Sequence, residues 1–179
     1  MTADPKLFMV FDVESVGLHG EGFAVAWVVV DETGKRIASA SYHCNPDDAV
    51  GHDDNRKWVA ANVTVPPVGY CRHPSHVRNE FWRAWAYANE RGATLWAECS
   101  WPVETRFLAA CVDDDFESRQ WSGPLPLHDI ATLRLAAGLD PLATVERLPD
   151  ELPAHNPLTD ATQSARLLLE AWKALRGGK

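Results

Sequence analysis

The sequence lacks any hydrophobic run long enough to cross a bilayer. Its longest apolar run extends from Phe23 to Val30, whereas a membrane-spanning helix needs about 20 apolar residues. The N-terminal residues MTADPKLF also lack a basic segment followed by an apolar stretch and a small-residue cleavage site. We therefore expect neither a secretory signal nor a membrane partner, and we predict a cytoplasmic protein.

Closely spaced cysteine pairs are also missing. None of the four cysteines has CxxC spacing, and a chain of 179 residues can bury a full core without disulfides. We therefore expect free thiols. One alternative stays open, a structural zinc site in a cluster whose spacing matches no common zinc motif. The residues of this cluster are His43, Cys44, Cys71, His73 and His76.

Positive charge is scarce. The chain has 17 Lys and Arg residues against 25 Asp and Glu residues, for a net charge of −8. Such a balance argues against a broad, sequence-independent grip on a long phosphate backbone. It does not exclude a nucleic-acid enzyme, because carboxylates that bind divalent cations make their own site attractive to phosphate. An enzyme of this kind should contact few nucleotides, at a chain end.

What the sequence does contain is the pattern of a single α/β domain over residues 1–179. Leu7 to Phe11 are apolar without alternation, as in a strand buried on both faces, and residues 22–30 form a second such run. After a glycine turn at 31–35, residues 36–44 alternate more and are more polar. These segments predict an antiparallel meander of three strands, with the third strand nearer an edge.

Later segments alternate between strands and helices. Residues 45–74 contain several prolines and glycines without a sustained period, which predicts a long irregular insertion with a short element around 58–65. Beyond it we expect a mixed sheet flanked by helices. The expected strands are 93–97 and 125–127, and the expected helices are 75–92, 102–112, 129–138 and 156–176.

Two carboxylates end the first strand. Asp12 and Glu14 project to the same face, about 7 Å apart along the chain. Two neighbouring anions repel each other unless a cation lies between them, so a divalent metal site is the economical explanation. The alternative is a pair of solvated loop residues.

A carboxylate and an imidazole meet at the start of the last helix. Asn156 is the expected cap and Pro157 the first helical residue, so Asp160 lies in the early turns and His155 just outside the cap. Alternatively, Asp160 favours the helix dipole and His155 is a surface residue. Together with Asp12 and Glu14, they match what two-metal phosphodiester cleavage requires: acidic ligands from separate elements and a nearby base. Histidine, with an ordinary pKa of about 6.5, can accept a proton near neutrality.

These segments resemble the motifs of a known family. DVESVGL at residues 12–18 resembles the D-x-E-[ST]-[ST]-G-L segment of DEDDh-type 3′–5′ exonucleases, the DnaQ-like branch of the ribonuclease H-like superfamily. HNPLTDA at residues 155–161 resembles that family's H-x-A-x-x-D-A ending. The resemblance covers most of residues 6–44 and 93–172. It implies a ribonuclease H-like fold, metal binding by Asp12, Glu14 and Asp160, and His155 as the general base.

The resemblance also implies a nucleotide contact and a further ligand. The segment Ser15, Val16, Gly17 and Leu18 would meet the terminal nucleotide, with Leu18 against its base. Where the family pattern resembles F-D-x-x-F-L, this chain has VETRFL, so Glu104 is the expected catalytic carboxylate and metal ligand. Alternatively, Glu98 is the carboxylate that binds metal at this position. A further alternative is that Glu104 only favours the start of its helix.

A carboxylate set suits Mg²⁺ or Mn²⁺, with two ions expected. Asp129 is interpreted as a helix cap, and His128 has no assigned role.

The leading hypothesis is a 3′–5′ exonuclease that releases 5′-mononucleotides from the 3′ end of single-stranded or short RNA or DNA. The alternatives are a catalytically weak or inactive interaction module using residues 58–85, and a nucleotide phosphohydrolase. The sequence leaves open whether the substrate is RNA or DNA and whether the protein forms a homodimer.

Overall fold

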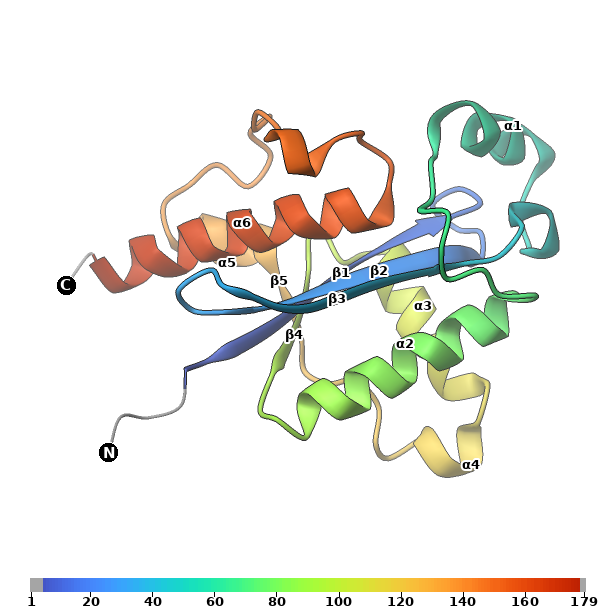
Figure 1. The fold of residues 1–179 in the computed structure, drawn as a ribbon, viewed down its shortest axis with the longest axis horizontal. Helices are drawn as coiled ribbons and strands as arrows, with labels where there is room; N and C mark the ends of the chain where they lie inside the picture. Colours follow the sequence, from blue (N-terminus) through green and yellow to red (C-terminus); the bar gives the residue numbers. More distant parts are fainter. Residues whose placement is uncertain (1–4, 178–179) are drawn as a thin grey trace.

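The computed structural model describes residues 5–177. Five strands form one mixed sheet in the order β3-β2-β1-β4-β5. Figure 1 shows helix α6 (Pro157–Gly177) across one face of the sheet, with α2 (Pro74–Asn89) and α3 (Val103–Asp113) on the other. The predicted α/β class, a mixed sheet flanked by helices, is confirmed.

The first three strands form the expected antiparallel meander. They are β1 (Leu7–Ser15), β2 (Gly22–Asp31) and β3 (Arg36–His43). The β2–β3 turn is held by Asp31, whose Oδ1 accepts hydrogen bonds from the backbone N–H groups of Thr33 and Lys35, and Gly34 supplies a φ of +96°. The third strand is at the sheet edge, and its first half is exposed, as its polar pattern predicted.

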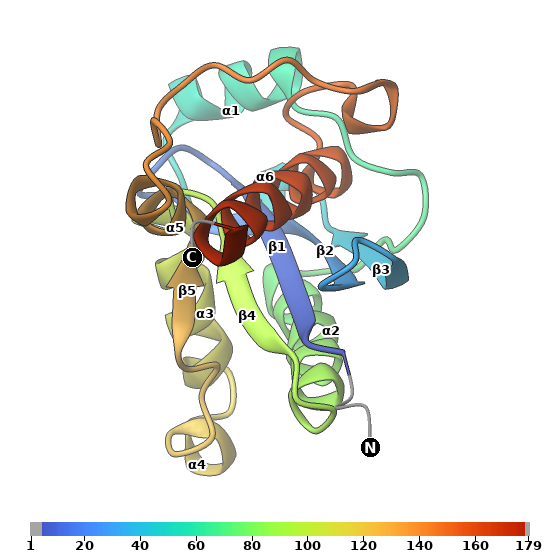
Figure 2. The same ribbon diagram turned by 90° about the vertical axis from the view of Figure 1, so that its left-hand side faces the viewer.

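Strands β4 (Thr94–Ala97) and β5 (Leu127–Asp129) run parallel to β1. Figure 2 shows the five strands side by side, with β1 at the centre. The carboxyl ends of β1, β4 and β5 therefore meet at one edge of the sheet. The last strand was predicted at 125–127. Its pairing with β4 starts at Leu127, so the strand begins two residues later than predicted.

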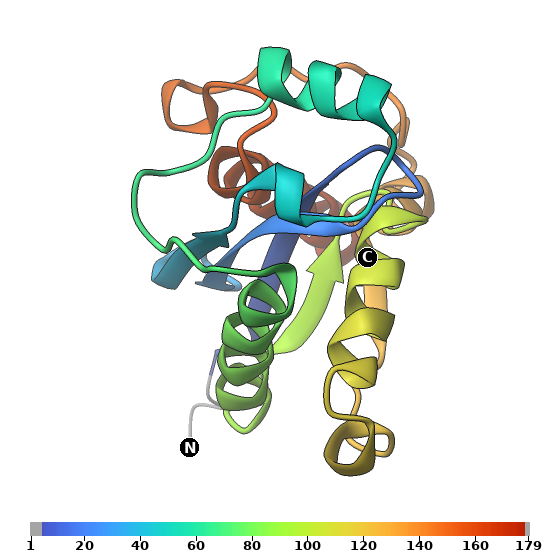
Figure 3. The ribbon, with the colours of Figure 1, turned by 90° about the vertical axis from the view of Figure 1, so that its right-hand side faces the viewer.

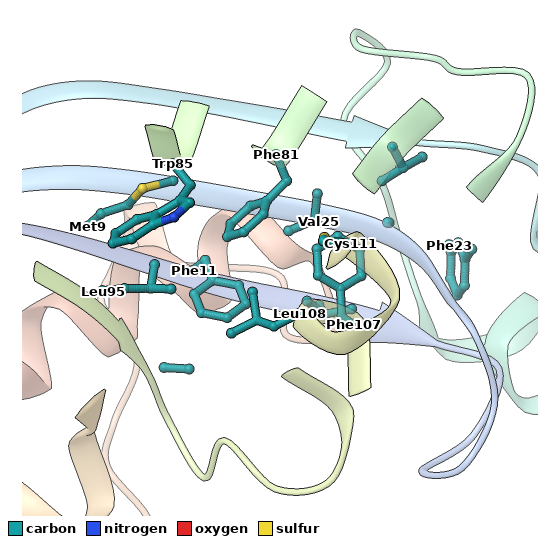
Figure 4. Close-up of a cluster of buried hydrophobic side chains, with 14 of the residues drawn as sticks. Met9, Phe11, Phe23, Val25, Phe81, Trp85, Leu95, Phe107, Leu108 and Cys111 are labelled. Carbon is teal, nitrogen blue, oxygen red and sulfur yellow. The ribbon is translucent and has the colours of Figure 1, made fainter. Parts of the chain in front are cut away.

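Alternation along β1 divides the core into two layers. Phe11 faces α2 and packs on Phe81, with ring centroids 4.9 Å apart, and Phe81 in turn packs on Phe107 of α3. Figure 4 shows this layer, with Phe11 and Leu95 of the sheet opposite Phe81 and Trp85. Phe81 and Trp85 recur at helical spacing along α2, so the aromatic face of this helix belongs to the core.

Phe8 and Val10 point to the other face, toward α6. Asp12 and Glu14 continue this alternation, so both belong to the face that α6 covers. The helix begins as predicted, because the Asn156 Oδ1 accepts a hydrogen bond from the backbone N–H of Leu158. Asp160 is therefore one turn into the helix.

Residues 45–74 are more ordered than the sequence indicated. They contain the 3-10 helix η1 (Pro46–Asp48) and helix α1 (Asp53–Asn62), which begins before the short element expected at 58–65. In Figure 3, α1 lies beyond the strand ends, above the carboxyl edge of the sheet. The polar composition of this helix, with one buried residue, Val59, explains why no hydrophobic period marked it.

Three short elements complete the fold. They are α4 (Phe116–Arg119), α5 (Ile130–Ala136) and the 3-10 helix η2 (Pro149–Glu151). Within residues 5–177, no helix combines the length and apolar character that crossing a membrane requires.

Candidate active site

The predicted acidic residues come together at the carboxyl edge of the sheet. Asp12 and Glu14 lie near the end of β1, Glu104 lies in the first turn of α3, and Asp160 lies in the first turns of α6. Residues from both ends of the chain reach the same place because β1 is the central strand and α6 packs directly on it.

Glu14, His155 and Asp160 form a group with metal-ligand geometry. Each offers one ligand atom, and these atoms all lie within 4.8 Å of one another. Among residues 5–177, no other group of three His, Cys, Asp or Glu side chains meets this criterion. The residues of the alternative zinc site around Cys71 therefore do not bring three ligand atoms this close together. The four cysteines are free, as expected.

Asp12 lies at the centre of the negative charge. Its burial raises the pKa of the carboxyl group well above the ordinary range, and four neighbouring carboxylates raise this pKa further. In decreasing order of effect, these neighbours are Glu104, Asp160, Glu14 and Glu98. Burial, followed by the charge of Asp160, raises the pKa of Glu14 to about 7. The site thus holds more negative charge than its own side chains neutralise.

Glu104 is the best-placed third carboxylate. Its side chain is buried, with 7% of the residue exposed, and burial raises its pKa to about 8. The backbone amides of Glu104 itself and of Val13 act in the opposite direction and lower this pKa, so the carboxylate lies near β1. Glu98, its competitor, accepts a hydrogen bond from Ser164 Oγ at 3.0 Å and has the weakest of the four effects on Asp12. The geometry favours Glu104.

Asp160 has a partner that the sequence did not reveal. Burial raises the pKa of Asp160, whereas the neighbouring Arg147 and His155 act in the opposite direction. Arg147 Nη1 donates to Asp160 Oδ1 at 2.5 Å. Arg147 lies in the irregular segment before η2, where no periodicity or motif signals its direction.

His155 is exposed but tethered. Its backbone has a φ of +55°, and its carbonyl accepts a hydrogen bond from the N–H of Thr64 at 2.8 Å. The His155 ring packs edge-on against Trp58 of α1, with centroids 5.1 Å apart. His155 is therefore held in place by residues of the 45–74 segment, whose purpose the sequence did not indicate.

The segment expected to meet a nucleotide is only partly accessible. Val16 is fully buried, and its backbone N–H donates to the carbonyl oxygen of Glu21, so neither its side chain nor its amide is available to a ligand. Leu18 is 67% exposed and lines a pocket of about 410 Å³. The other residues of this pocket include Glu14, Ser15, Gly17, Asn55, Trp58 and His155. Asn55 and Trp58 thus join the site, and only the tertiary position of α1 could have identified them.

Two neighbouring residues have structural roles. Asp129 caps α5, since its Oδ1 accepts a hydrogen bond from the N–H of Thr132 at 2.7 Å, and its Oδ2 accepts one from the N–H of Ser100. The capping interpretation is confirmed. His128 stacks on Trp96, with ring centroids 4.6 Å apart.

The donor set fits a hard divalent cation. Glu14, Asp160 and His155 offer ligand atoms that lie within 4.8 Å of one another. Asp12 and Glu104 are outside this group but interact electrostatically within the same acidic cluster, which contains no thiolate. Carboxylate oxygens suit Mg²⁺ and Mn²⁺, and a bound cation would favour the charged forms of these groups, which burial and, for Asp12 and Glu14, neighbouring carboxylates disfavour.

The overall architecture matches known structures. A moderately thermophilic Exonuclease I from Methylocaldum szegediense superposes with a TM-score of 0.63 at 14% sequence identity. The chain is therefore similar in fold to a part of that Exonuclease I. The match covers 97% of this chain and 41% of that one. The ribonuclease H-like mixed sheet predicted from the sequence is therefore confirmed.

Two further Exonuclease I structures give the same result. An apo form has a TM-score of 0.56 at 13% identity, and an ExoI/SSB-Ct complex has a TM-score of 0.55 at 12% identity. Each match covers 97% of this chain and 42% of the other, so the chain spans about two fifths of the Exonuclease I length. No protein-family profile matches the chain, and no curated protein matches it in sequence.

Proposed function

We propose that the protein is a metal-dependent 3′–5′ exonuclease that releases 5′-mononucleotides from the 3′ end of single-stranded or short RNA or DNA. The observation that carries this proposal is the group of Glu14, Asp160 and His155, whose ligand atoms lie within 4.8 Å of one another, next to the buried carboxyl group of Asp12. Glu104 has the largest charge effect on Asp12. The Exonuclease I fold supports the same class of reaction.

The four carboxylates would hold two Mg²⁺ or Mn²⁺ ions. When bound, such ions supply Lewis-acid stabilisation of the phosphodiester and lower the pKa of water. His155 would accept the proton of the attacking water, since its exposed ring adjoins Glu14 and Asp160. Its tether to Thr64 limits the directions in which the ring can point.

The pocket beside these carboxylates would receive the terminal nucleotide. Leu18 and Trp58 offer apolar surfaces to a base, and Asn55 offers an amide. The pocket of about 410 Å³ has room for few groups, which suits an enzyme of negative net charge that binds a chain end. The position of α1 over the carboxyl edge would limit entry to flexible, unpaired ends.

The test is hydrolysis of oligonucleotides labelled at the 5′ end, with and without Mn²⁺. We expect a ladder shortened one nucleotide at a time, abolished by a chelator and by Asp12→Asn or Asp160→Asn. Glu117→Gln, on the exposed helix α4, is the matched loss of one carboxylate and should keep full activity. Wild-type activity in Asp160→Asn would refute the proposal.

The same assay separates the alternatives. Hydrolysis of a nucleoside monophosphate or triphosphate with an intact oligonucleotide would identify a nucleotide phosphohydrolase. A folded protein with no metal-dependent hydrolysis of either substrate would identify an interaction module. An RNA and a DNA oligomer of the same sequence, compared side by side, determine the sugar preference.

A further inference from the structure

Arg147 makes an unusual contact for a residue outside the acidic cluster. Its Nη1 donates to Asp160 Oδ1 and also to the carbonyl oxygen of Glu151, at 2.8 Å. Asp160 belongs to the group whose ligand atoms lie within 4.8 Å of one another. A protein cation therefore already binds one of the carboxylates that would bind a metal ion.

The segment that carries Arg147 is firmly attached. The carboxylate of Glu151, 1% exposed, accepts two hydrogen bonds from Arg166, at 2.6 and 2.8 Å, and one from the N–H of Leu148. Arg166 and Asp160 both belong to α6. The backbone around Arg147 is thus fixed to the helix that presents Asp160, and this directs the guanidinium to Asp160.

A guanidinium and a divalent cation compete for the same carboxylate. An oxygen that accepts a short charge-assisted hydrogen bond has less electron density for a metal, and the two positive charges repel at contact distance. The long side chain of Arg147 can turn away while its backbone stays in place. The rival arrangement keeps Arg147 on Oδ1 and leaves Oδ2 for the metal, in which case Arg147 supports metal binding.

We propose that Arg147 is a tethered cation that occupies the Asp160 carboxylate and is displaced when a divalent metal binds, so that it sets the metal affinity of the site. This inference rests on the proposed function, because it requires the carboxylates to bind metal. Arg147 is a positioning residue here, and its effect is measured on metal binding itself.

The test is calorimetric titration of Mn²⁺ into the full chain, with free Mn²⁺ followed independently by electron paramagnetic resonance. We expect Arg147→Met to bind Mn²⁺ about tenfold more tightly than the wild type, the order of a lost charge-assisted hydrogen bond. Arg147→Lys keeps the charge without the forked guanidinium and should lie between the two. Thermal unfolding in a chelator verifies that each variant is folded.

Arg36→Met is the matched control. Arg36 is exposed and donates to Thr162 on the same helix, α6, so the substitution removes one positive charge away from the acidic cluster. It should leave Mn²⁺ affinity unchanged.

The outcomes separate the inference from the proposed function. Equal or weaker Mn²⁺ binding by both Arg147 variants, with binding retained by the wild type, overturns the inference and leaves the metal site in place. Failure of the wild type and of every folded Arg147 variant to bind Mn²⁺ overturns both. Tighter binding by Arg147→Met that Asp12→Asn abolishes supports both.

Discussion

Replacing Glu104 by glutamine should stabilise the metal-free protein at high pH and not at low pH. Glu104 is buried against β1, and its pKa rises from an ordinary value of 4.5 to about 8. A carboxyl group whose pKa is raised on folding binds more protons in the folded state between these two values. Its stabilising contribution is therefore complete below about pH 4.5 and is lost as the pH rises through about 8.

The magnitude follows from the two pKa values. A tenfold change in a protonation equilibrium is worth about 1.4 kcal/mol, so ionised Glu104 costs the folded state at most about 5 kcal/mol at about pH 9. Glutamine removes the charge and keeps an oxygen atom near the same backbone amides. We expect Glu104→Gln to recover only about 2 kcal/mol of this cost in the free energy of unfolding, because the amide N–H groups of glutamine need new hydrogen-bond partners.

The assay is urea unfolding in a chelator at about pH 5 and about pH 9, followed by the fluorescence of the eight tryptophans. The free energy of unfolding of Glu104→Gln should exceed that of the wild type at the higher pH only, whereas Glu117→Gln should change neither value. Equal destabilisation of Glu104→Gln at both pH values would refute the reasoning. In place of the chelator, Mn²⁺ should stabilise the wild type at the higher pH, since a bound cation favours the ionised form of the buried carboxylates.

Three further changes test other parts of the structure. His155→Gln should lower kcat by a factor of about 10² to 10⁴ with little change in KM for an oligonucleotide, because it removes the proposed base. Steady-state kinetics measure the two parameters separately. Trp58→Ala should mainly raise KM, with Trp58→Phe nearer the wild type, in the same assay; a fall in kcat alone would contradict the stacking role. Arg166→Met should lower the free energy of unfolding by about 3 kcal/mol in urea, because it leaves the buried Glu151 carboxylate unpaired, and adding Glu151→Gln should recover part of this loss.

Much of the fold could be predicted because it follows from local patterns. Unbroken apolar runs identified the central strands, and the polar alternation of residues 36–43 placed β3 at an edge. The spacing of Val77, Phe81 and Trp85 identified the buried face of α2. Local caps such as Asn156 and Asp129 fixed helix starts, since each cap involves residues a few positions apart.

The predicted ligands also came from short-range information. Asp12 and Glu14 share a face because strand side chains alternate, and His155 and Asp160 share a helix end because they are only five positions apart in the chain. Their meeting across the molecule was an expectation drawn from the motif resemblance. The physical cause is the packing of α6 on β1, which the sequence expresses only as two apolar faces.

Local sequence patterns were enough to predict the central strands, the main helices and the candidate ligands. Tertiary structure alone decided that α1 brings Trp58 and Asn55 to the site, and that the segment before η2 directs Arg147 onto Asp160. Those contacts join polar residues far apart in the chain or in irregular segments. Hydrophobic periodicity gives no information on such segments, because individual hydrogen bonds and ion pairs position them and not a repeating apolar face.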